Sequence, residues 1–87
     1  VDHPKIPTWE MTLSSGAVCM NLLSCAQSLG YAAQWLTEWY AYNKTMLEYL
    51  GGRPEIDKIS GFIYLGHKLE EPMERRRPDP EKVISYL

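Results

Sequence analysis

The first third of the chain is dominated by a long run of apolar and small residues. No proline occurs between residues 11 and 29, and apolar side chains fall on nearly every side of a helix of that length. Thr8 offers a hydroxyl as N-cap, and Gly30 can end the helix in a left-handed conformation. The pattern predicts a helix over 8–29, about 33 Å long, that is buried nearly all round.

Such a helix is long for a chain of 87 residues. A helix without a polar face that spans a small domain fits the centre of a dimer better than one side of a monomer. We therefore expect this helix to lie at a subunit interface.

Shorter elements follow the long helix. Residues 32–36 are aromatic and apolar, as in a buried strand. Asn43 can cap a short helix over 44–50, and residues 58–65 are rich in strand-forming side chains. The predicted order is helix, strand, helix, strand.

The C-terminal segment is polar and proline-rich. Residues 67–87 are predicted to form an extended tail that wraps over a surface. Residues 83–87 are apolar again, which suits an edge strand added to another sheet, such as that of a partner.

The composition indicates a protein partner and argues against nucleic acid and membranes as partners. Hydrophobic residues make up 45% of the sequence, more than the core of so small a chain can easily hide. The net charge of −2 gives no field that favours nucleic acid or an anionic membrane. Residues 16–26, the longest apolar stretch, are too few to cross a bilayer. We expect neither nucleic acid nor membrane as a partner.

The cysteines and the N-terminus indicate a cytoplasmic protein. Cys19 and Cys25 lie six residues apart on the predicted helix, so they project from different faces and cannot form a disulfide with each other. No signal peptide pattern precedes the helix. The opening Val1 is what a cut chain would show.

No catalytic constellation and no metal site are predicted. The sequence has no glycine-rich phosphate loop, no Cys-x-x-Cys, no His-Glu-x-x-His and no nucleophile elbow. His3 and His67 are expected to be neither ligands nor bases. Any enzymatic chemistry would have to come from elsewhere.

Two segments are candidates for ligand binding. The aromatic residues from Trp35 to Trp39 follow a strand, where ligand crevices commonly form, although the pattern alone favours simple core aromatics. Residues 75–77 are three arginines that could clamp a phosphate, although flanking acidic residues favour a solvated charge run.

Several short motifs together resemble a known family. They are Pro7-Thr8-Trp9-Glu10, Ser15-Gly16-Ala17, Ala26-Gln27-Ser28-Leu29-Gly30-Tyr31, Trp35-Leu36-Thr37 and Asp57-Lys58-Ile59-Ser60-Gly61-Phe62-Ile63-Tyr64-Leu65-Gly66. In order and spacing, nearly the whole chain resembles the nitroreductase family, in its branch of small bacterial enzymes. The resemblance implies an α+β fold in which helices flank a mainly antiparallel sheet. It also implies an intertwined homodimer with two FMN sites at the subunit interface.

The resemblance also implies where FMN would be contacted. It places Trp35, Leu36 and Thr37 where the backbone approaches the isoalloxazine ring, with a main-chain amide near N5. Glu38 stands where relatives often have glycine, so a carboxylate comes close to the flavin, directed either inward or outward. Arg75 and Arg77 are candidates for more remote phosphate contacts.

Residues 1–87 would then be the C-terminal part of a single nitroreductase-like domain. The N-terminal half, which carries the phosphate-holding cluster in this family, is absent from these residues. With that half supplied, the implied activity is hydride transfer from NAD(P)H through FMN to a nitroaromatic, a quinone or a similar small acceptor. The 87 residues in isolation would be inactive.

Two alternatives remain at this point. The chain could be a truncated or proteolysed fragment that binds no flavin. It could also be a small dimerising interaction module, which would explain the excess apolar surface but not the ordered motifs.

Overall fold

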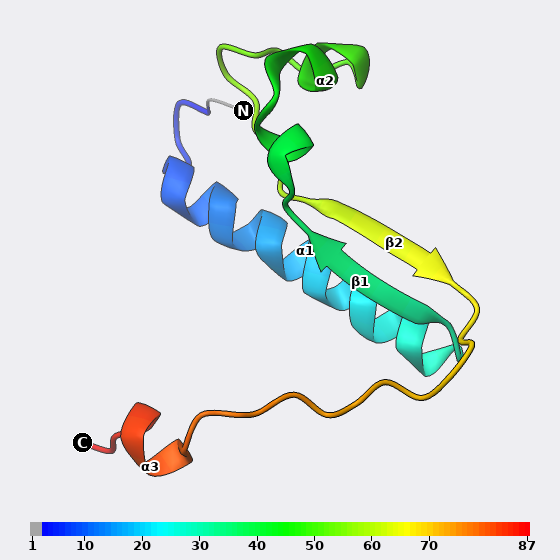
Figure 1. Ribbon diagram of the computed structural model, residues 1–87. Coiled ribbons are helices and arrows are strands. Elements are labelled where there is room, and N and C mark those ends of the chain that lie inside the picture. Colours follow the sequence, from blue (N-terminus) through cyan, green and yellow to red (C-terminus); the bar gives the residue numbers. More distant parts are fainter. Residues whose placement is uncertain (1–2) are drawn as a thin grey trace.

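The computed structural model describes residues 3–87 as a small α+β arrangement (Figure 1). Its elements, in chain order, are the helix α1 (Thr8–Ser28), the strand β1 (Ala32–Leu36), the 3-10 helix η1 (Trp39–Tyr42), the helix α2 (Lys44–Tyr49), the strand β2 (Phe62–Gly66) and the short helix α3 (Pro80–Val83). The order helix, strand, helix, strand is the predicted one, with η1 added between β1 and α2.

The start of α1 differs from the prediction. Thr8 is the first helical residue and not the N-cap; Pro7 occupies the cap position, in an extended conformation and without a side-chain hydrogen bond. The Pro7 carbonyl still accepts from Met11 N–H at 3.2 Å. The fixed φ of proline suits this extended entry into the helix.

The end of α1 follows the predicted glycine mechanism. Gly30 has a φ of 88°, the left-handed region that glycine enters at little cost. The Gly30 N–H donates to Gln27 O and the Tyr31 N–H donates to Ala26 O, both at 3.0 Å. This pair of bonds satisfies carbonyls at the helix end and turns the chain directly into β1.

The sheet consists of β1 and β2 in antiparallel pairing. Ala32 lies opposite Gly66, and Leu36 lies opposite Phe62. β2 therefore begins at Phe62, and the prediction of a strand over 58–65 was wrong at its start. The physical reason is Gly61, whose φ of 149° departs from strand geometry just before the ladder begins.

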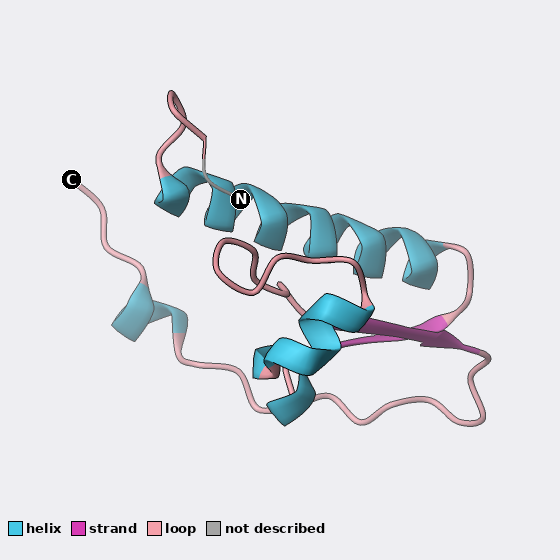
Figure 2. Cartoon of the chain, turned by 90° about the horizontal axis from the view of Figure 1, so that it is seen from above, coloured by secondary structure: helices cyan, strands magenta, loops and turns pink. Residues whose placement is uncertain are grey.

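α1 covers one face of the sheet, and η1 and α2 lie beyond the C-terminal end of β1 (Figure 1). Figure 2 shows α1 along one face, and η1 and α2 follow from the end of β1. The Tyr40 ring of η1 packs edge-on against Phe62, with ring centroids 4.8 Å apart. α2 begins at Asn43, whose side chain accepts from Met46 N–H at 2.9 Å, as the capping prediction required.

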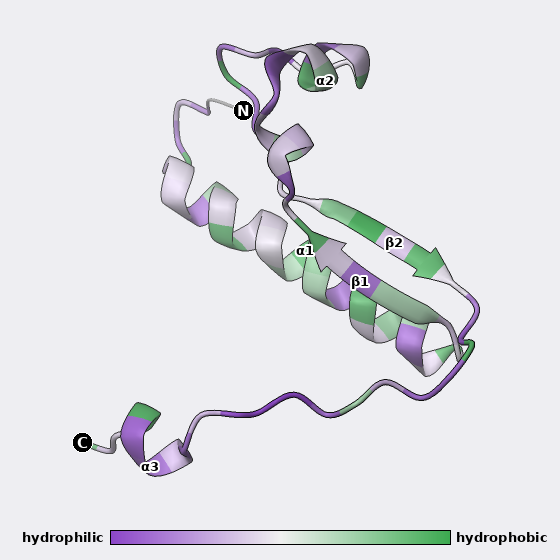
Figure 3. Cartoon of the chain, viewed as in Figure 1, coloured by the Kyte–Doolittle hydropathy of each residue, from purple (hydrophilic) through white to green (hydrophobic). Residues whose placement is uncertain are grey.

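Very little of the chain is buried. Among the described residues only Ala26 and Ala41 are buried, so the prediction that α1 is buried nearly all round was wrong for the chain by itself. Large apolar side chains of α1 are exposed, among them Leu13, Val18 and Met20. Figure 3 shows hydrophobic positions along α1 and both strands, whereas the tail is largely hydrophilic.

The overall dimensions lead to the same conclusion. The accessible surface is 8089 Å², whereas a compact monomer of this mass exposes about 5,200 Å². The radius of gyration is 16.6 Å, against about 12 Å for a compact domain of this length. The difference in area is comparable to the surface that permanent protein interfaces bury. The sheet and α1 therefore need further protein to cover them.

The tail is extended only in part. α3 interrupts it, because Asp79 accepts from Glu81 N–H at 3.0 Å and Pro80 suits the first helical turn. Residues 83–87, predicted as an edge strand, form no strand in the described chain.

Acidification should loosen the turn that precedes β2. The Arg53 N–H donates to Asp57 Oδ2 at 2.8 Å, and the guanidinium adds an ion pair at 3.3 Å. The backbone hydrogen bond first, and then the side-chain bond, lower the pKa of Asp57 below its usual 3.8. The stabilisation is therefore complete above that value and is lost as the pH falls through the depressed pKa.

An NMR titration of the Arg53 amide between neutral pH and pH 2 measures this effect. We expect its shift to change below pH 3.8 and expect no such step in an Asp57→Asn variant. A step of the same size in both proteins would contradict the assignment.

Candidate functional site

The side chain of Trp35 connects three segments at the C-terminal end of β1. Its indole Nε1–H donates to the Ser60 carbonyl at 2.9 Å. A Cβ placed on Gly16 of α1 would lie 3.7 Å from the indole Cη2, an ordinary contact distance. The Ser60 hydroxyl is also hydrogen-bonded to the Ser15 hydroxyl of α1. We call Ser15, Gly16, Trp35, Ser60 and Gly61 the Trp35 clamp.

Gly61 completes the clamp by a close approach of its backbone. A Cβ at Gly61 would lie 2.1 Å from Trp35 Nε1 and 3.1 Å from the Leu36 carbonyl oxygen. Together with the φ of 149°, this leaves room only for glycine. The chain just before β2 is thus held directly against the peptide that joins Leu36 to Thr37.

The Thr37 amide faces away from this contact. The Leu36 carbonyl lies on the side of β2, and the described peptide bonds are trans. In a trans peptide the N–H points opposite to the C=O, so the Thr37 N–H lies on the free side of β1. Within residues 3–87 this N–H donates to no other group. The strand therefore ends in an available backbone donor.

Glu38 directs its side chain to solvent. The residue is exposed and precedes η1, and its carbonyl accepts from Ala41 N–H at 2.8 Å. Its carboxylate is close enough to Tyr40 to contribute to the raised pKa of that phenol.

Tyr40 and Tyr64 form a hydroxyl pair behind the strand end. Their oxygens lie 2.5 Å apart. This hydrogen bond is the largest of the causes that raise the pKa of Tyr40 to about 12; loss of solvation and the charges of Tyr64 and Glu38 add to it. The hydroxyl pair ties η1 to β2.

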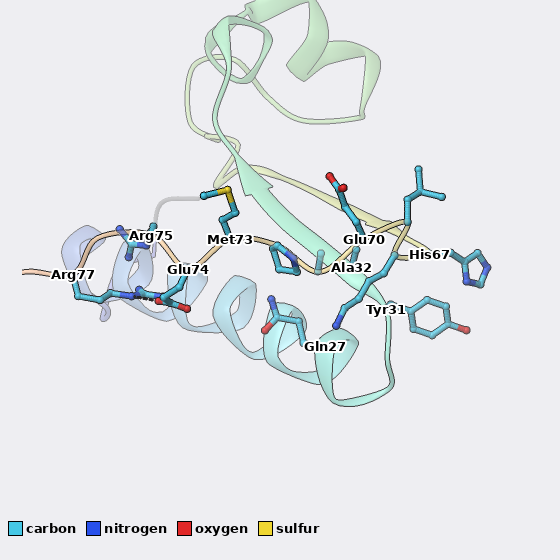
Figure 4. Close-up of a pocket in the computed structure, with 13 residues that line it drawn as sticks. Gln27, Tyr31, Ala32, His67, Glu70, Met73, Glu74, Arg75 and Arg77 are labelled. Atoms are coloured by element: carbon cyan, nitrogen blue, oxygen red, sulfur yellow. Dashed lines mark hydrogen bonds and ion pairs between the residues drawn. The ribbon is translucent and has the colours of Figure 1, made fainter.

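Arg75 reaches the site from the tail. It lines a hollow of about 920 Å³ together with Trp35, Gln34 and Tyr64. A second hollow of about 740 Å³ lies between the tail and the end of α1, and both Arg75 and Arg77 line it (Figure 4). Leu36, Thr37 and Glu38 line neither hollow.

The two arginines differ in how they are paired. Arg77 is held by Glu74, with its Nε and a terminal nitrogen 2.7 and 2.6 Å from Oε1 (Figure 4). Arg75 has no ion pair with any residue of the described range. Arg75 is thus the guanidinium that remains available for an external anion.

The structure brings only part of the predicted site together. Trp35 and Arg75 share a hollow, the backbone of Leu36 to Glu38 leads away from its edge, and Arg77 is already neutralised. The Trp35 clamp could not be predicted from the sequence, because Ser15 and Ser60 lie 45 residues apart and only the fold joins them.

Neither a metal site nor a membrane-spanning helix is found in the described part of the chain. Within residues 3–87, no three histidine, cysteine or acidic side chains gather in a way that could hold a metal ion. No helix in the same range has the length and apolar character needed to cross a bilayer.

Comparison with known proteins gives the family context. No protein-family model matches the chain. The chain is 31% identical over 87 residues to the protein named "Putative NAD(P)H nitroreductase YdjA" of Escherichia coli K12, and equally to the protein of that name of Escherichia coli O157:H7. Each match covers 99% of this chain and 47% of the relative. The chain therefore spans about half the length of the curated relatives it matches, and its resemblance to the nitroreductase family is confirmed for the C-terminal half only.

Proposed function

We propose that these residues form the flavin-facing C-terminal part of an FMN-dependent NAD(P)H oxidoreductase subunit with the nitroreductase fold. The observation that carries the proposal is the available Thr37 N–H at the end of β1, at the position where the resemblance puts an amide near the flavin N5.

The residues present fit an FMN in three respects. The Thr37 N–H supplies a donor for the ring edge, the unpaired Arg75 supplies a positive charge for the phosphate, and Trp35, two residues before Thr37, lines the same hollow as Arg75. A guanidinium is well suited to phosphate because it offers a planar fork of donors. FMN bound there would accept a hydride from NAD(P)H and pass electrons to a nitroaromatic, a quinone or a similar acceptor.

The role of this chain is then to bind and orient. The Thr37 N–H would hold the ring edge, and Arg75 would hold the phosphate end. Glu38 points to solvent, so the carboxylate is a candidate for the rim of the site and not for its floor. None of these groups would exchange a proton with the substrate.

The exposed apolar surface fits the remaining partners of the proposal. The N-terminal half of the same subunit and a second subunit would cover α1 and the sheet, whose outer edges are unpaired in the described chain. A small interaction module would explain the same exposure but gives no role to the ordered motif match. Cytoplasmic location is part of the same proposal.

FMN titration of two proteins tests the proposal. Quenching of flavin fluorescence should show tight binding to the complete subunit that carries these residues, and weak or no binding to residues 1–87 alone. NAD(P)H-dependent quinone reduction should likewise be measurable with the complete subunit and absent with residues 1–87 alone. A complete subunit that binds no FMN would overturn the proposal.

Separate substitutions of Arg75 and Arg77 should distinguish the roles of these two side chains. Arg75→Gln is expected to weaken FMN binding about 3- to 10-fold, because one charge-assisted hydrogen bond to the phosphate is lost at a partly exposed site. Arg77→Gln is the matched control, since that guanidinium already pairs with Glu74, and we expect less than a twofold change. Equal effects in both variants, measured by FMN titration of the complete subunit, would show that Arg75 has no special contact.

A further inference from the structure

The Trp35 clamp does more than pack two elements together. The indole N–H of Trp35 donates to the Ser60 carbonyl at 2.9 Å. Ser60 is in turn held from the other side by Ser15 of α1. The hydrogen bonds thus run from the long helix, through the chain before β2, to the end of β1.

The position held by these bonds is that of a single peptide. Gly61 follows Ser60 directly, and its backbone lies against the Leu36 carbonyl oxygen. That carbonyl belongs to the peptide whose N–H is the Thr37 donor, and in a trans peptide the two groups point in opposite directions. Ser60 and Gly61 thus lie beside the peptide whose N–H is the Thr37 donor.

We propose that Trp35 is a positioning residue, which acts through Ser60 and Gly61 to aim the Thr37 N–H at the flavin. The inference rests on the proposed function and deepens it by giving the Trp35 side chain a role. The indole does not need to touch the cofactor for this role. Its hydrogen bond, supported by Ser15, fixes the distance and direction of a donor on the neighbouring residue.

Two substitutions in the complete subunit test the proposal. Trp35→Phe keeps an aromatic ring and removes the Nε1 donor, and Ser15→Ala removes the hydroxyl that supports Ser60. Ser28→Ala is the matched control, because it removes a serine hydroxyl from the same helix that bonds only to Ser24 one turn away. FMN affinity and the midpoint potential of the bound flavin are measured together with the unfolding temperature.

A change in the direction of the Thr37 N–H should change the midpoint potential of the bound flavin as well as the affinity for FMN. We expect Trp35→Phe to weaken FMN binding about 3- to 10-fold, as the loss of one well-directed hydrogen bond would. If the variant weakens the binding of one redox state of the flavin about 3- to 10-fold more than that of the other, the midpoint potential shifts by about 15–30 mV. Ser15→Ala should shift both quantities in the same direction by less, and Ser28→Ala should leave both unchanged.

The outcomes separate the two proposals. Lower unfolding temperatures in Trp35→Phe and Ser15→Ala, with unchanged FMN affinity and potential, would reduce the clamp to a packing role and overturn this inference alone. If Trp35→Phe does not fold, Ser15→Ala decides by the same criterion. A complete unsubstituted subunit without FMN would overturn the proposed function, and this inference with it.

Discussion

Gly61→Ala should destabilise the protein by about 2–4 kcal/mol, the combined cost of backbone strain and of overpacking against a fixed neighbour. The new Cβ would lie 2.1 Å from Trp35 Nε1, and the φ of 149° would have to change before the methyl group could be accommodated. Either adjustment breaks the indole bond to Ser60. Urea unfolding followed by circular dichroism measures the loss.

Gly66→Ala is the matched control for this prediction. Gly66 ends the same strand, and a Cβ there meets nothing within 4 Å. We expect a change of less than about 0.5 kcal/mol, as for ordinary surface substitutions. Similar losses in both variants would mean that the close approach at Gly61 does not determine the stability of this region.

Thr37→Pro should weaken FMN binding to the complete subunit by about 10- to 100-fold, because it removes the backbone donor and leaves an acceptor of the flavin unpaired. The fold should tolerate the change, since Leu36 already lies in a strand, the conformation preferred before proline. Thr37→Ala keeps the N–H and should bind FMN within twofold of the unsubstituted protein. FMN titration with a check of folding by circular dichroism compares the two variants.

An unchanged affinity in a folded Thr37→Pro variant would contradict the assignment of the donor. A large loss in Thr37→Ala would instead point to the hydroxyl of the threonine. The pair of variants therefore distinguishes a main-chain contact from a side-chain contact.

Local signals in the sequence were sufficient for the end of α1, for the start of α2 and for β1. The glycine at position 30 and the side chain of Asn43 act through bonds within a few residues, so their effects on α1 and α2 can be predicted without knowledge of the fold. The β1 boundaries at 32 and 36 depend on a short aromatic and apolar stretch between polar turns, which is also local information.

The start of β2 could not be predicted in the same way. Residues 58–60 precede a run of strand-forming side chains in the sequence. In the structure, however, Ser60 is hydrogen-bonded to Trp35 and Ser15, and the positive φ of Gly61 ends this segment before strand pairing begins. These contacts join positions 25 and 45 residues apart. The expectation of a fully extended tail failed for a different reason: Asp79 caps, and Pro80 begins, a short helix within it.

The candidate site could likewise be predicted only in part. The resemblance could place the segment from Trp35 to Glu38, because the motif itself is in the sequence. It did not distinguish Arg75 from Arg77, because acidic residues flank both in the sequence and only the structure shows that Glu74 pairs with Arg77. The resemblance also could not show that the Trp35 indole N–H donates to the Ser60 carbonyl.

A visible absorption spectrum of the purified complete subunit shows whether these residues are part of a flavoprotein. The spectrum is recorded before and after denaturation, and the released chromophore is identified by chromatography. We predict flavin absorption bands and release of one FMN per subunit. A colourless subunit that stays colourless after incubation with FMN would contradict the account.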